Sequence, residues 1–421
     1  MKKLITSLIL LTFLLSACVN LPAQTSTAVE PNLAASPSEV AEPSIETPAE
    51  TAQTLETEKT TTLANPTEAP TLAPTPEPTL EPTPAPTHEL PAIVITDAFN
   101  REVKFQKPPV RIALVGKGVF MVADAVYMFP SVRDRVIGIA AMQQKSADFL
   151  SILDPNLDQK QQIEMSAGPE QIAALQPDCV ILKTTNKELG ESLASLGIPV
   201  VFLELETYAQ YDRDLETLGQ LFQEQDRAIK LRAYYRTNVA DISKYFVDMP
   251  DEDLPSVLLI NYRAEDGAVS FDVAPTSWIQ TALVETAGGL PVWKDAPLGK
   301  GWTKVGLEQI AAWDPDYIFV TSYTAPVLEA VATLKVDPQW QELSAVKNAR
   351  LRPMLGDIYP YDQPDTRWVL GLLWFARSLH PDYIWSLDFY EAARNFYSNM
   401  YGMDTKTYEQ HIKPLLRPYF Q

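Results

Sequence analysis

Cysteine and histidine are scarce in this sequence of 421 residues, which contains 2 cysteines and 3 histidines. Because Cys18 lies near the start of the chain, Cys179 has no partner for a disulfide bond within the remainder. The histidines His88, His380 and His411 form no cluster with metal-ligand spacing, which argues against a bare zinc or manganese site. We therefore expect any metal to arrive inside its own chelator, although ligation of haem iron by a tyrosine stays open.

The sequence also lacks the short motifs that carry common catalytic chemistry. It contains no GxSxG elbow, no Walker-type glycine loop, no HExxH and no GxGxxG. Two short glycine turns with a lysine, at 116–118 and 297–302, do not have the spacing of a phosphate-binding loop. These absences favour a binding protein without a cofactor over an enzyme.

The apolar run at the start of the chain is too short for a membrane-spanning helix. It extends from Leu4 to Leu15, whereas a span needs about 20 apolar residues. Two lysines precede it and small residues follow it, as in a secretory signal. The stretch LSAC, ending at Cys18, resembles the bacterial lipoprotein box, which implies a signal peptide over 1–18 and a lipid on Cys18. The alternative is an ordinary signal with a cysteine there by chance.

Residues 19–91 contain no Phe, Trp or Tyr, but they contain 14 Pro, 15 Thr and 11 Glu. Without aromatic side chains the segment has little apolar area to offset the entropy of ordering, so we expect it to be disordered. Repeated proline favours extended polyproline II of roughly 3 Å per residue. The segment is therefore predicted to be a tether, and its Thr and Pro content would suit O-glycosylation.

Positive charge is also in short supply, since the formal net charge is −20. Residues 92–421 hold 31 basic and 43 acidic residues. This balance suits a soluble domain and argues against nucleic acid as a partner.

From Ile93 onwards the sequence is typical of a globular α/β protein. The stretch 93–105 predicts two short strands around an Asn/Arg turn. Further on, near-continuous apolar runs alternate with helical segments, as in parallel strands that are buried on both faces. These runs lie at 110–116, 135–142, 178–183 and 199–204, and Cys179 falls in the third.

A long helix separates this region from a second one of the same kind. Ala228, Leu231, Tyr235, Val239, Ile242 and Phe246 form one helical stripe, and Pro250 follows it. Apolar runs then resume at 256–262, 287–293, 317–323 and 350–355. The sequence therefore predicts two α/β lobes with mainly parallel sheets, joined by a single long helix, with a ligand cleft between them. We expect the N-terminal lobe at 92–222, the helix at 223–249 and the C-terminal lobe with terminal helices at 250–421.

One segment occurs twice, as GPEQIAALQPDCVIL at 168–182 and GLEQIAAWDPDYIFV at 306–320. The two copies share eight of fifteen positions at an offset of 138 residues. A single repeat of this kind indicates two similar halves rather than a solenoid.

The order of these motifs resembles the substrate-binding proteins of ABC transporters of the iron-siderophore, haem and cobalamin class. ITDAFNREV, DRVIGI and the first copy of the repeat resemble the N-terminal lobe, whereas WIQTALVETAGGLPVW, the second copy and PDTRWVLGLLWFARSLHP resemble the C-terminal lobe. The resemblance covers residues 92–400 and implies two lobes joined by a stiff helix, with the ligand held between them.

The resemblance also implies a role for one glutamate in each copy of the repeat. In such proteins a glutamate on each lobe docks against arginines of the permease dimer, and the matching positions are Glu170 and Glu308. Two exposed carboxylates could orient a carrier on a two-fold permease. The alternative is that each glutamate only complements the dipole at the start of a helix.

Ligand-binding residues of α/β lobes usually follow the carboxyl ends of strands. Lysine and arginine bind oxyanions, and tyrosine and tryptophan cover flat faces, which together suit an anionic chelate. The alternative for each position is an ordinary solvated loop, and Arg367 could also brace the final helix instead of facing the cleft. By this rule the candidates are Lys117, Met142, Gln143, Tyr262, Arg263, Trp278, Tyr323, Tyr359 and Arg367.

The sequence thus predicts a lipid-anchored binding protein at the outer face of the cytoplasmic membrane, in the periplasm or at the cell surface. It would capture a siderophore-type iron chelate, haem, a corrinoid or an oxyanion and deliver it to an ABC permease. The alternative is a tethered sensory or binding lipoprotein that uses the same fold without transport. No residue in the sequence selects one ligand among these.

Overall fold

The computed structural model describes residues 93–142, 147–265, 267–384 and 387–420. The predictions on the signal peptide, on the lipid at Cys18 and on the tether lie outside these residues, and so does Gln143. Residues 84–421 form one compact unit, to which all described residues belong. None of the described helices is long and apolar enough to cross a membrane.

The N-terminal lobe is built around a five-stranded sheet in the order β5-β4-β3-β6-β7, in which every neighbouring pair is parallel. The central strands β3 and β6 are buried along their whole length, as their apolar runs predicted. The burial of Cys179 also raises the pKa of its thiol. The strands are β3 (Ile112–Leu114), β4 (Val136–Ala140), β5 (Gln161–Ile163), β6 (Cys179–Lys183) and β7 (Val200–Leu203).

A hairpin precedes this sheet, and helices connect its strands. The hairpin pairs β1 (Ile93–Thr96) with β2 (Glu102–Phe105), which confirms the predicted pair of short strands. The buried Asp97 closes its turn, because its carboxylate accepts hydrogen bonds from the backbone N–H groups of Phe99 and Arg101. The helices of this lobe are α1 (Val119–Tyr127), α2 (Ala147–Leu153), α3 (Pro169–Ala173), α4 (Lys187–Ser195) and α5 (Tyr208–Phe222).

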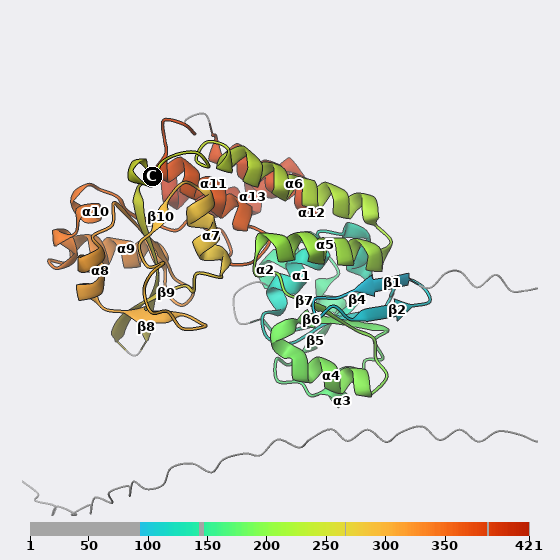
Figure 1. Cartoon of the computed structure of the whole chain (residues 1–421). Coiled ribbons are helices and arrows are strands. Elements are labelled where there is room, and N and C mark those ends of the chain that lie inside the picture. The colour runs from blue at the N-terminus through green and yellow to red at the C-terminus, as the bar shows by residue number, and fades with distance from the viewer. Residues whose placement is uncertain (1–92, 143–146, 266, 385–386, 421) are drawn as a thin grey trace, which may run out of the picture. The chain divides into compact units, whose positions relative to one another are not determined.

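The predicted long helix is α6 (Gln225–Ser243), which lies beside α5 and ends before the second sheet begins (Figure 1). Its buried residues are Ala228, Leu231, Tyr235 and Ile242, which belong to the helical stripe in the sequence. Through this stripe α6 contacts α5 of the first lobe and α7 and α11 of the second.

The C-terminal lobe contains a second sheet in the order β11-β9-β8-β12-β13, with β10 paired to β8. The strands β8, β12 and β13 are parallel, whereas β9 is antiparallel to both β8 and β11. The sequence did not predict β9 and β11, and it ended β8 too early. The strands are β8 (Ser256–Glu265), β9 (Ala268–Val273), β10 (Leu290–Pro291), β11 (Thr303–Val305), β12 (Tyr317–Thr321) and β13 (Leu351–Pro353).

Helices cover this second sheet and end the chain. The prediction of two α/β lobes with mainly parallel sheets is confirmed by these two sheets and their helices. The helices are α7 (Ile279–Thr286), α8 (Leu307–Trp313), α9 (Val327–Val336), α10 (Ser344–Lys347), α11 (Trp368–Leu379), α12 (Phe389–Tyr401), α13 (Thr405–His411) and α14 (Lys413–Leu416).

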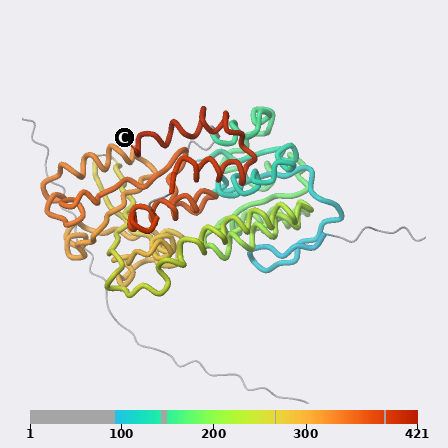
Figure 2. The backbone as a smooth tube through the Cα atoms, turned by 90° about the horizontal axis from the view of Figure 1, so that it is seen from above, coloured from blue at the N-terminus to red at the C-terminus, as the bar shows by residue number. Residues whose placement is uncertain are grey.

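The C-terminal segment makes a second connection between the lobes, which the sequence did not predict. The Arg133 guanidinium donates to the carbonyl of Tyr401 at 2.8 Å, and Arg227 donates to that of Asn399 at 2.8 Å. Phe149 of α2 packs edge-on against the Tyr401 ring at 5.0 Å. The C-terminal helices therefore reach the N-terminal lobe, as Figure 2 shows from above.

The two copies of the repeat have the same local structure. Each forms a short helix (α3 and α8) and a buried strand (β6 and β12), joined by a turn with one residue at positive φ, at Gln176 or Asp314. The aspartate before each strand binds the start of the neighbouring strand. Asp178 accepts from the backbone N–H groups at 110 and 111, and Asp316 accepts from the N–H and the hydroxyl of Ser256. The copied aspartates therefore link adjacent strands through hydrogen bonds.

Candidate functional site

The loop after β3 presents one exposed lysine, Lys117, on a backbone held in place by Asn186. The Asn186 side chain accepts from the Lys117 N–H at 2.8 Å and donates to the Lys117 carbonyl at 2.9 Å. Gly116 has φ 87°, and a Cβ there would lie 2.6 Å from the Asn186 side chain, so glycine is required. Within the described residues the Lys117 ammonium forms no ion pair, which leaves its charge available at the carboxyl end of β3.

A second lysine at this edge of the sheet is already neutralised. Lys183, the last residue of β6, is buried, and its Nζ lies 2.6 Å from Oε1 of Glu206. The same ammonium donates to the carbonyl of Glu204 at 2.6 Å. Of these two lysines, Lys117 is therefore the one whose charge is not balanced by a neighbouring carboxylate among the described residues.

The C-terminal lobe contributes aromatic rings. Trp278 and Trp302 meet edge-on at 5.6 Å between ring centroids, and Trp302 lies 5.8 Å from Tyr323. We call these three residues the aromatic cluster. All three are partly exposed, so they combine a packed arrangement with ring surface that a flat ligand can contact.

A buried carboxyl group lies behind the aromatic cluster. The Tyr323 hydroxyl donates to Oδ2 of Asp362 at 2.5 Å, and Thr321 donates to Oδ1 at 2.7 Å. Burial raises the pKa of Asp362 to about 6, although both hydrogen bonds oppose this rise. Burial and the neighbouring Asp362 raise the pKa of the Tyr323 phenol well above its usual value, so the phenol keeps its proton. Asp362 thus fixes the orientation of the Tyr323 ring.

Two predicted residues lie inside a strand rather than in a loop. Tyr262 and Arg263 pair with Phe271 and Ser270 because β8 continues into a hairpin with β9. Tyr262 is buried, and its ring centroid lies 6.0 Å from that of Phe271. The Arg263 guanidinium lies 2.7 Å from the Glu265 carboxylate, so a neighbour already balances its charge.

Arg367 and Tyr359 are enclosed at the boundary between the lobes. The side chains of Arg367 and Asp124 are both 0% exposed, and their Nη1 and Oδ2 atoms are 2.7 Å apart. Asp124 belongs to α1 of the first lobe, whereas Arg367 precedes α11 of the second. Tyr359 stacks on Phe120 of α1 at 5.2 Å. In this structure both residues join the two lobes, and their predicted contact with a ligand stays a prediction.

Arg367 lies among three aspartate carboxyl groups, which is more than its single positive charge can neutralise. Its Nε donates a hydrogen bond to the Tyr397 hydroxyl at 2.9 Å and lies 3.4 Å from Oδ1 of Asp357. Its Nη1 lies 3.6 Å from Oδ2 of Asp365. The guanidinium also lies over the ring of Phe149 at 4.0 Å. We call Arg367, Asp124, Asp357, Asp365 and Tyr397 the Arg367 cluster.

Burial shifts the titration of the Arg367 cluster. It raises the pKa of Asp124 to about 6 and that of Asp365 to about 8, although the attraction of Arg367 opposes both rises. Burial alone would lower the pKa of Arg367, but Tyr397 and the three acids outweigh it and raise that pKa well above its usual value. At neutral pH the arginine is therefore charged, and Asp365 holds a proton.

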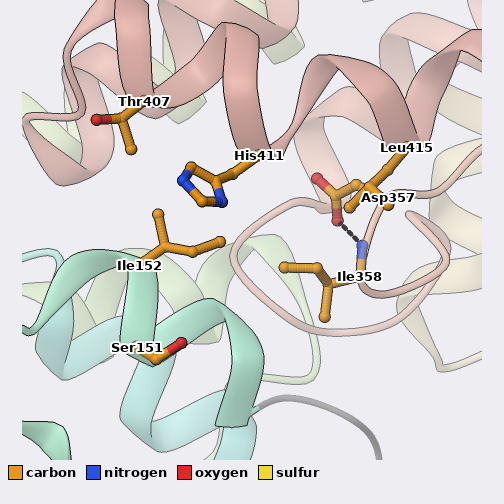
Figure 3. A pocket seen from close by; sticks show the side chains of 7 residues that line it. All are labelled: Ser151, Ile152, Asp357, Ile358, Thr407, His411 and Leu415. Atoms are coloured by element: carbon orange, nitrogen blue, oxygen red, sulfur yellow. Dashed lines mark hydrogen bonds between the residues drawn. The ribbon is translucent and has the colours of Figure 1, made fainter.

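A pocket of about 730 Å³ lies beside this cluster, between α2 and the C-terminal helices (Figure 3). In Figure 3 Ser151 and Ile152 of α2 lie across from Thr407 and His411 of α13. The pocket offers hydroxyl groups, an imidazole and apolar side chains, and the sequence did not indicate it. It is lined by Ser151, Ile152, Asp357, Ile358, Thr407, His411 and Leu415.

The remaining predicted residues lie apart from these groups. Met142 follows β4 and is partly buried, and Gln143 lies outside the described residues. Glu170 and Glu308 are exposed in the first turns of α3 and α8, each two residues after a glycine N-cap. Both carboxylates are thus accessible at matching positions, and the helix dipole favours them there as well.

Metal-ligating side chains are not gathered in the described part of the chain, where no group of three or more His, Cys, Asp or Glu is placed to hold a metal ion. His380 is the C-cap residue of α11. Its Nε2 lies 2.8 Å from the Gly288 carbonyl, and its ring stacks on Phe246 at 4.1 Å. Burial lowers the pKa of His380, so this histidine is part of the core.

The structure therefore brings Trp278 and Tyr323 together and, separately, Tyr359 and Arg367. The sequence did not single out Trp302 or Asp124. Trp302 ends the glycine turn at 297–302, and an aromatic residue between such a turn and a strand was the available signal. Asp124 lies inside an apolar helix, and a lone acid in such a helix usually needs a buried partner.

Comparison with known proteins links this fold to one family. Residues 115–354, more than half of the chain, match the family described as periplasmic binding protein. The petrobactin-binding protein YclQ of Bacillus subtilis is 24% identical over 213 residues, which cover 49% of this chain and 60% of that protein. The molybdate-binding protein MolA of Haemophilus influenzae is 22% identical over 264 residues, which cover 57% of this chain and 72% of that protein. This chain thus matches less than two thirds of the length of the petrobactin-binding protein.

Solved structures show the same fold. A periplasmic solute binding protein from Veillonella parvula DSM 2008 has a TM-score of 0.63 at 22% identity, covering 78% of this chain and 99% of that one. Ceue of Helicobacter pylori, solved with Ni(II) bound, has a TM-score of 0.59 at 17% identity, and the match covers 76% of this chain and 99% of that one.

Proposed function

Because the chain belongs to the periplasmic binding protein family, we propose that it is the lipid-anchored solute-binding component of an ABC importer. Proteins of this type act outside the cytoplasm and bind small ligands for a cognate permease. The proposed cargo is an anionic metal chelate of the siderophore type, with haem, a corrinoid or an oxyanion as the other classes. The lipid would be attached to Cys18.

The observation that carries the choice of cargo is the contrast between the loops of the two lobes. The N-terminal lobe offers the uncompensated ammonium of Lys117, on a backbone that Asn186 holds in place. The C-terminal lobe offers the ring surfaces of the aromatic cluster. A positive charge suits the oxyanions of a chelate, and aromatic rings suit its flat apolar parts. The curated relatives that bind petrobactin and molybdate support an anionic cargo.

Docking on the permease is proposed to use Glu170 and Glu308, one from each lobe. Each stands exposed at the start of its helix, with no ion pair among the described residues that would occupy the carboxylate. Such carboxylates can form ion pairs with arginines of a partner and set the register of the complex. The duplicated surroundings give the two carboxylates the same local presentation.

The ligand can be identified from the protein itself. The full chain, purified from its native host in a non-ionic detergent, would be scanned for absorbance and for the mass of a carried molecule. We expect a bound metal chelate, and replacing Lys117 or Trp302 by alanine should weaken its binding by about tenfold each. Recovery of a cationic or uncharged ligand would contradict the proposed cargo.

Transport is tested by charge reversal at the docking positions. The double variant Glu170→Lys/Glu308→Lys should abolish uptake of the ligand by cells while the purified variant still binds it. The matched control is Glu188→Lys/Glu329→Lys, which reverses one exposed glutamate of a nearby helix in each lobe. If uptake by the first variant equals that of the control, the protein is better described as a tethered binding or sensory lipoprotein.

A further inference from the structure

A second, smaller pocket lies in the C-terminal lobe between the starts of β12 and β13 and the end of α11. It has a volume of about 330 Å³ and is lined by Tyr317, Arg352, Trp374, Arg377, Ser378 and Pro381. We call it the arginine pocket. Tyr317 begins β12, whereas Tyr323 of the aromatic cluster follows the end of that strand. The arginine pocket therefore lies at the opposite edge of the sheet from the proposed cargo site.

Neither arginine of this pocket has a partner for its charge in the part of the chain that the structure describes. Within the described residues, no carboxylate forms an ion pair with Arg352 or Arg377, and neither guanidinium donates a hydrogen bond to a protein acceptor. Two guanidinium groups present ten N–H donors between them, about five each. The nearby acids do not compensate. Asp316 binds Ser256 and lies 4.0 Å from Arg350, and Asp382 is exposed without pairing to either arginine.

Buried donors in the same pocket also lack acceptors. The indole N–H of Trp374, the hydroxyl of Ser378 and Nε of Arg352 are hidden from solvent and have no hydrogen-bond partner among the described residues. Trp374 is 7% exposed and Ser378 is 3% exposed. A buried donor without an acceptor costs about 1–3 kcal/mol, so native proteins rarely collect several in one place. Three of them in one pocket, beside two unpaired arginines, indicate an acceptor that the chain itself does not supply.

We propose that the arginine pocket binds a small anion through an oxyanion group, either a phosphate or a carboxylate. Arginine forks match such groups with paired hydrogen bonds, and the Trp374 and Ser378 donors add neutral ones. The rings of Tyr317 and Trp374 would flank the body of the ligand. The volume suits a small molecule or a single lipid head group. This second site is independent of the proposed transport cargo.

The test uses the full chain in a non-ionic detergent. Binding of inorganic phosphate and of citrate is measured by titration calorimetry, and retention of phosphatidylglycerol against phosphatidylcholine is measured by native mass spectrometry. We expect wild type to bind at least one anionic probe, and Arg352→Gln/Arg377→Gln to weaken that binding by at least about tenfold. The double variant Arg394→Gln/Arg417→Gln removes the same charge elsewhere in the C-terminal lobe and should bind like wild type.

The probes separate the two sources of the oxyanion. Binding of phosphate or citrate assigns the pocket to a soluble anion, and retention of phosphatidylglycerol alone assigns it to a lipid head group. The proposal is overturned if wild type binds none of the anionic probes. It is also overturned if the Arg352→Gln/Arg377→Gln variant binds them as tightly as wild type does.

A conservative variant guards against loss of folding in the double variant. Trp374→Phe keeps an aromatic six-membered ring and removes the indole N–H together with the rest of the five-membered ring, and circular dichroism should still match that of wild type. If the N–H serves the anion, binding should fall by roughly threefold to tenfold. If the indole N–H does not donate to the anion, binding stays unchanged and the proposed contact is wrong.

Discussion

The two lobes share three strands and differ in the strands beside them. In the N-terminal lobe the parallel strands β3-β6-β7 continue into β4 and β5, which are also parallel. In the C-terminal lobe the equivalent β8-β12-β13 continue into β9, which runs antiparallel in a hairpin with β8. The shared strands include the duplicated segment, so the repeat marks the common scaffold, and the lobes diverge at one side of it.

This difference separates the residues that link strands from the residues that are proposed to bind the ligand. The common part contains the aspartates that fasten adjacent strands, Asp178 and Asp316. The divergent part of the C-terminal lobe brings Trp278 and Trp302 to Tyr323. The N-terminal lobe instead presents Lys117 on a short turn whose backbone is hydrogen-bonded to Asn186. Similar scaffolds thus carry an aromatic surface in one lobe and a positive charge in the other.

The largest effect is expected where the lobes meet, at Arg367. Replacing it by methionine keeps much of the volume but leaves Asp124, Asp357 and Asp365 buried without their cation. Removing one partner of a buried ion pair costs about 3–5 kcal/mol. We expect a fall of that size in the free energy of unfolding, measured by urea denaturation with tryptophan fluorescence.

The control for Arg367→Met is Arg394→Met. Arg394 forms an exposed ion pair with Glu391 at 3.4 Å, and such pairs contribute about 0–1 kcal/mol. Equal losses in the two variants would mean that the Arg367 cluster does not hold the lobes together.

A smaller effect is expected from the copied aspartates, and it should differ between the lobes. Asp178→Ala removes two bonds to backbone N–H groups on the exposed side of the sheet, whereas Asp316→Ala removes partly buried bonds to Ser256. We expect the free energy of unfolding to fall by about 1–2 kcal/mol in each variant. The fall should be greater for Asp316→Ala, because polar groups that are buried without a partner cost more free energy than exposed ones. Thermal and urea unfolding measure both.

Asp134→Ala serves as the control for this pair. Asp134 is exposed and accepts no hydrogen bond among the described contacts, so its removal should leave stability unchanged. If Asp178→Ala costs more than Asp316→Ala, burial does not decide the difference between the two lobes.

The sequence predicted the strands that form the common scaffold, because these strands are buried on both faces and read as apolar runs. It missed β5, β9 and β11 because they lie toward the side of each sheet that carries shorter or more exposed strands. In β9, for example, the first two of six residues are exposed and the next two are half-buried, so no apolar run marks this strand. Local signals therefore found the shared strands and missed most of the divergent ones.

The site residues divide in the same way. Lys117, Trp278 and Tyr323 were proposed because each lies just beyond a predicted strand or at the start of a predicted helix. The setting of Arg367 could not be predicted, since its partner Asp124 lies 243 residues away and reaches it only through the packing of one lobe on the other. A sequence pattern shows that an arginine is present, but long-range contacts decide whether it faces a ligand or is enclosed.

The last expected effect is a dependence of stability on pH that originates between the lobes. Burial raises the pKa of Asp365 from 3.8 to about 8. Between these values the folded chain keeps a proton that the unfolded chain releases, so the free energy of unfolding falls as the pH rises from about 4 to about 8. Asp124 acts in the same direction up to about pH 6. Asp365→Asn cannot titrate and should lose its part of this slope.

The measurement compares melting temperatures at pH 5 and pH 8 in wild type and Asp365→Asn. Between pH 5 and pH 8 the melting temperature of wild type should fall further than that of Asp365→Asn. The gap should be roughly 2–4 °C for each kcal/mol by which the two losses of unfolding free energy differ. Other titrating groups, such as His380, are present in both chains and cancel in this comparison. Asp134→Asn should keep the wild-type slope. An equal slope in wild type and Asp365→Asn would show that Asp365 is ionised in the folded protein, and that the acids around Arg367 carry more negative charge than their burial favours.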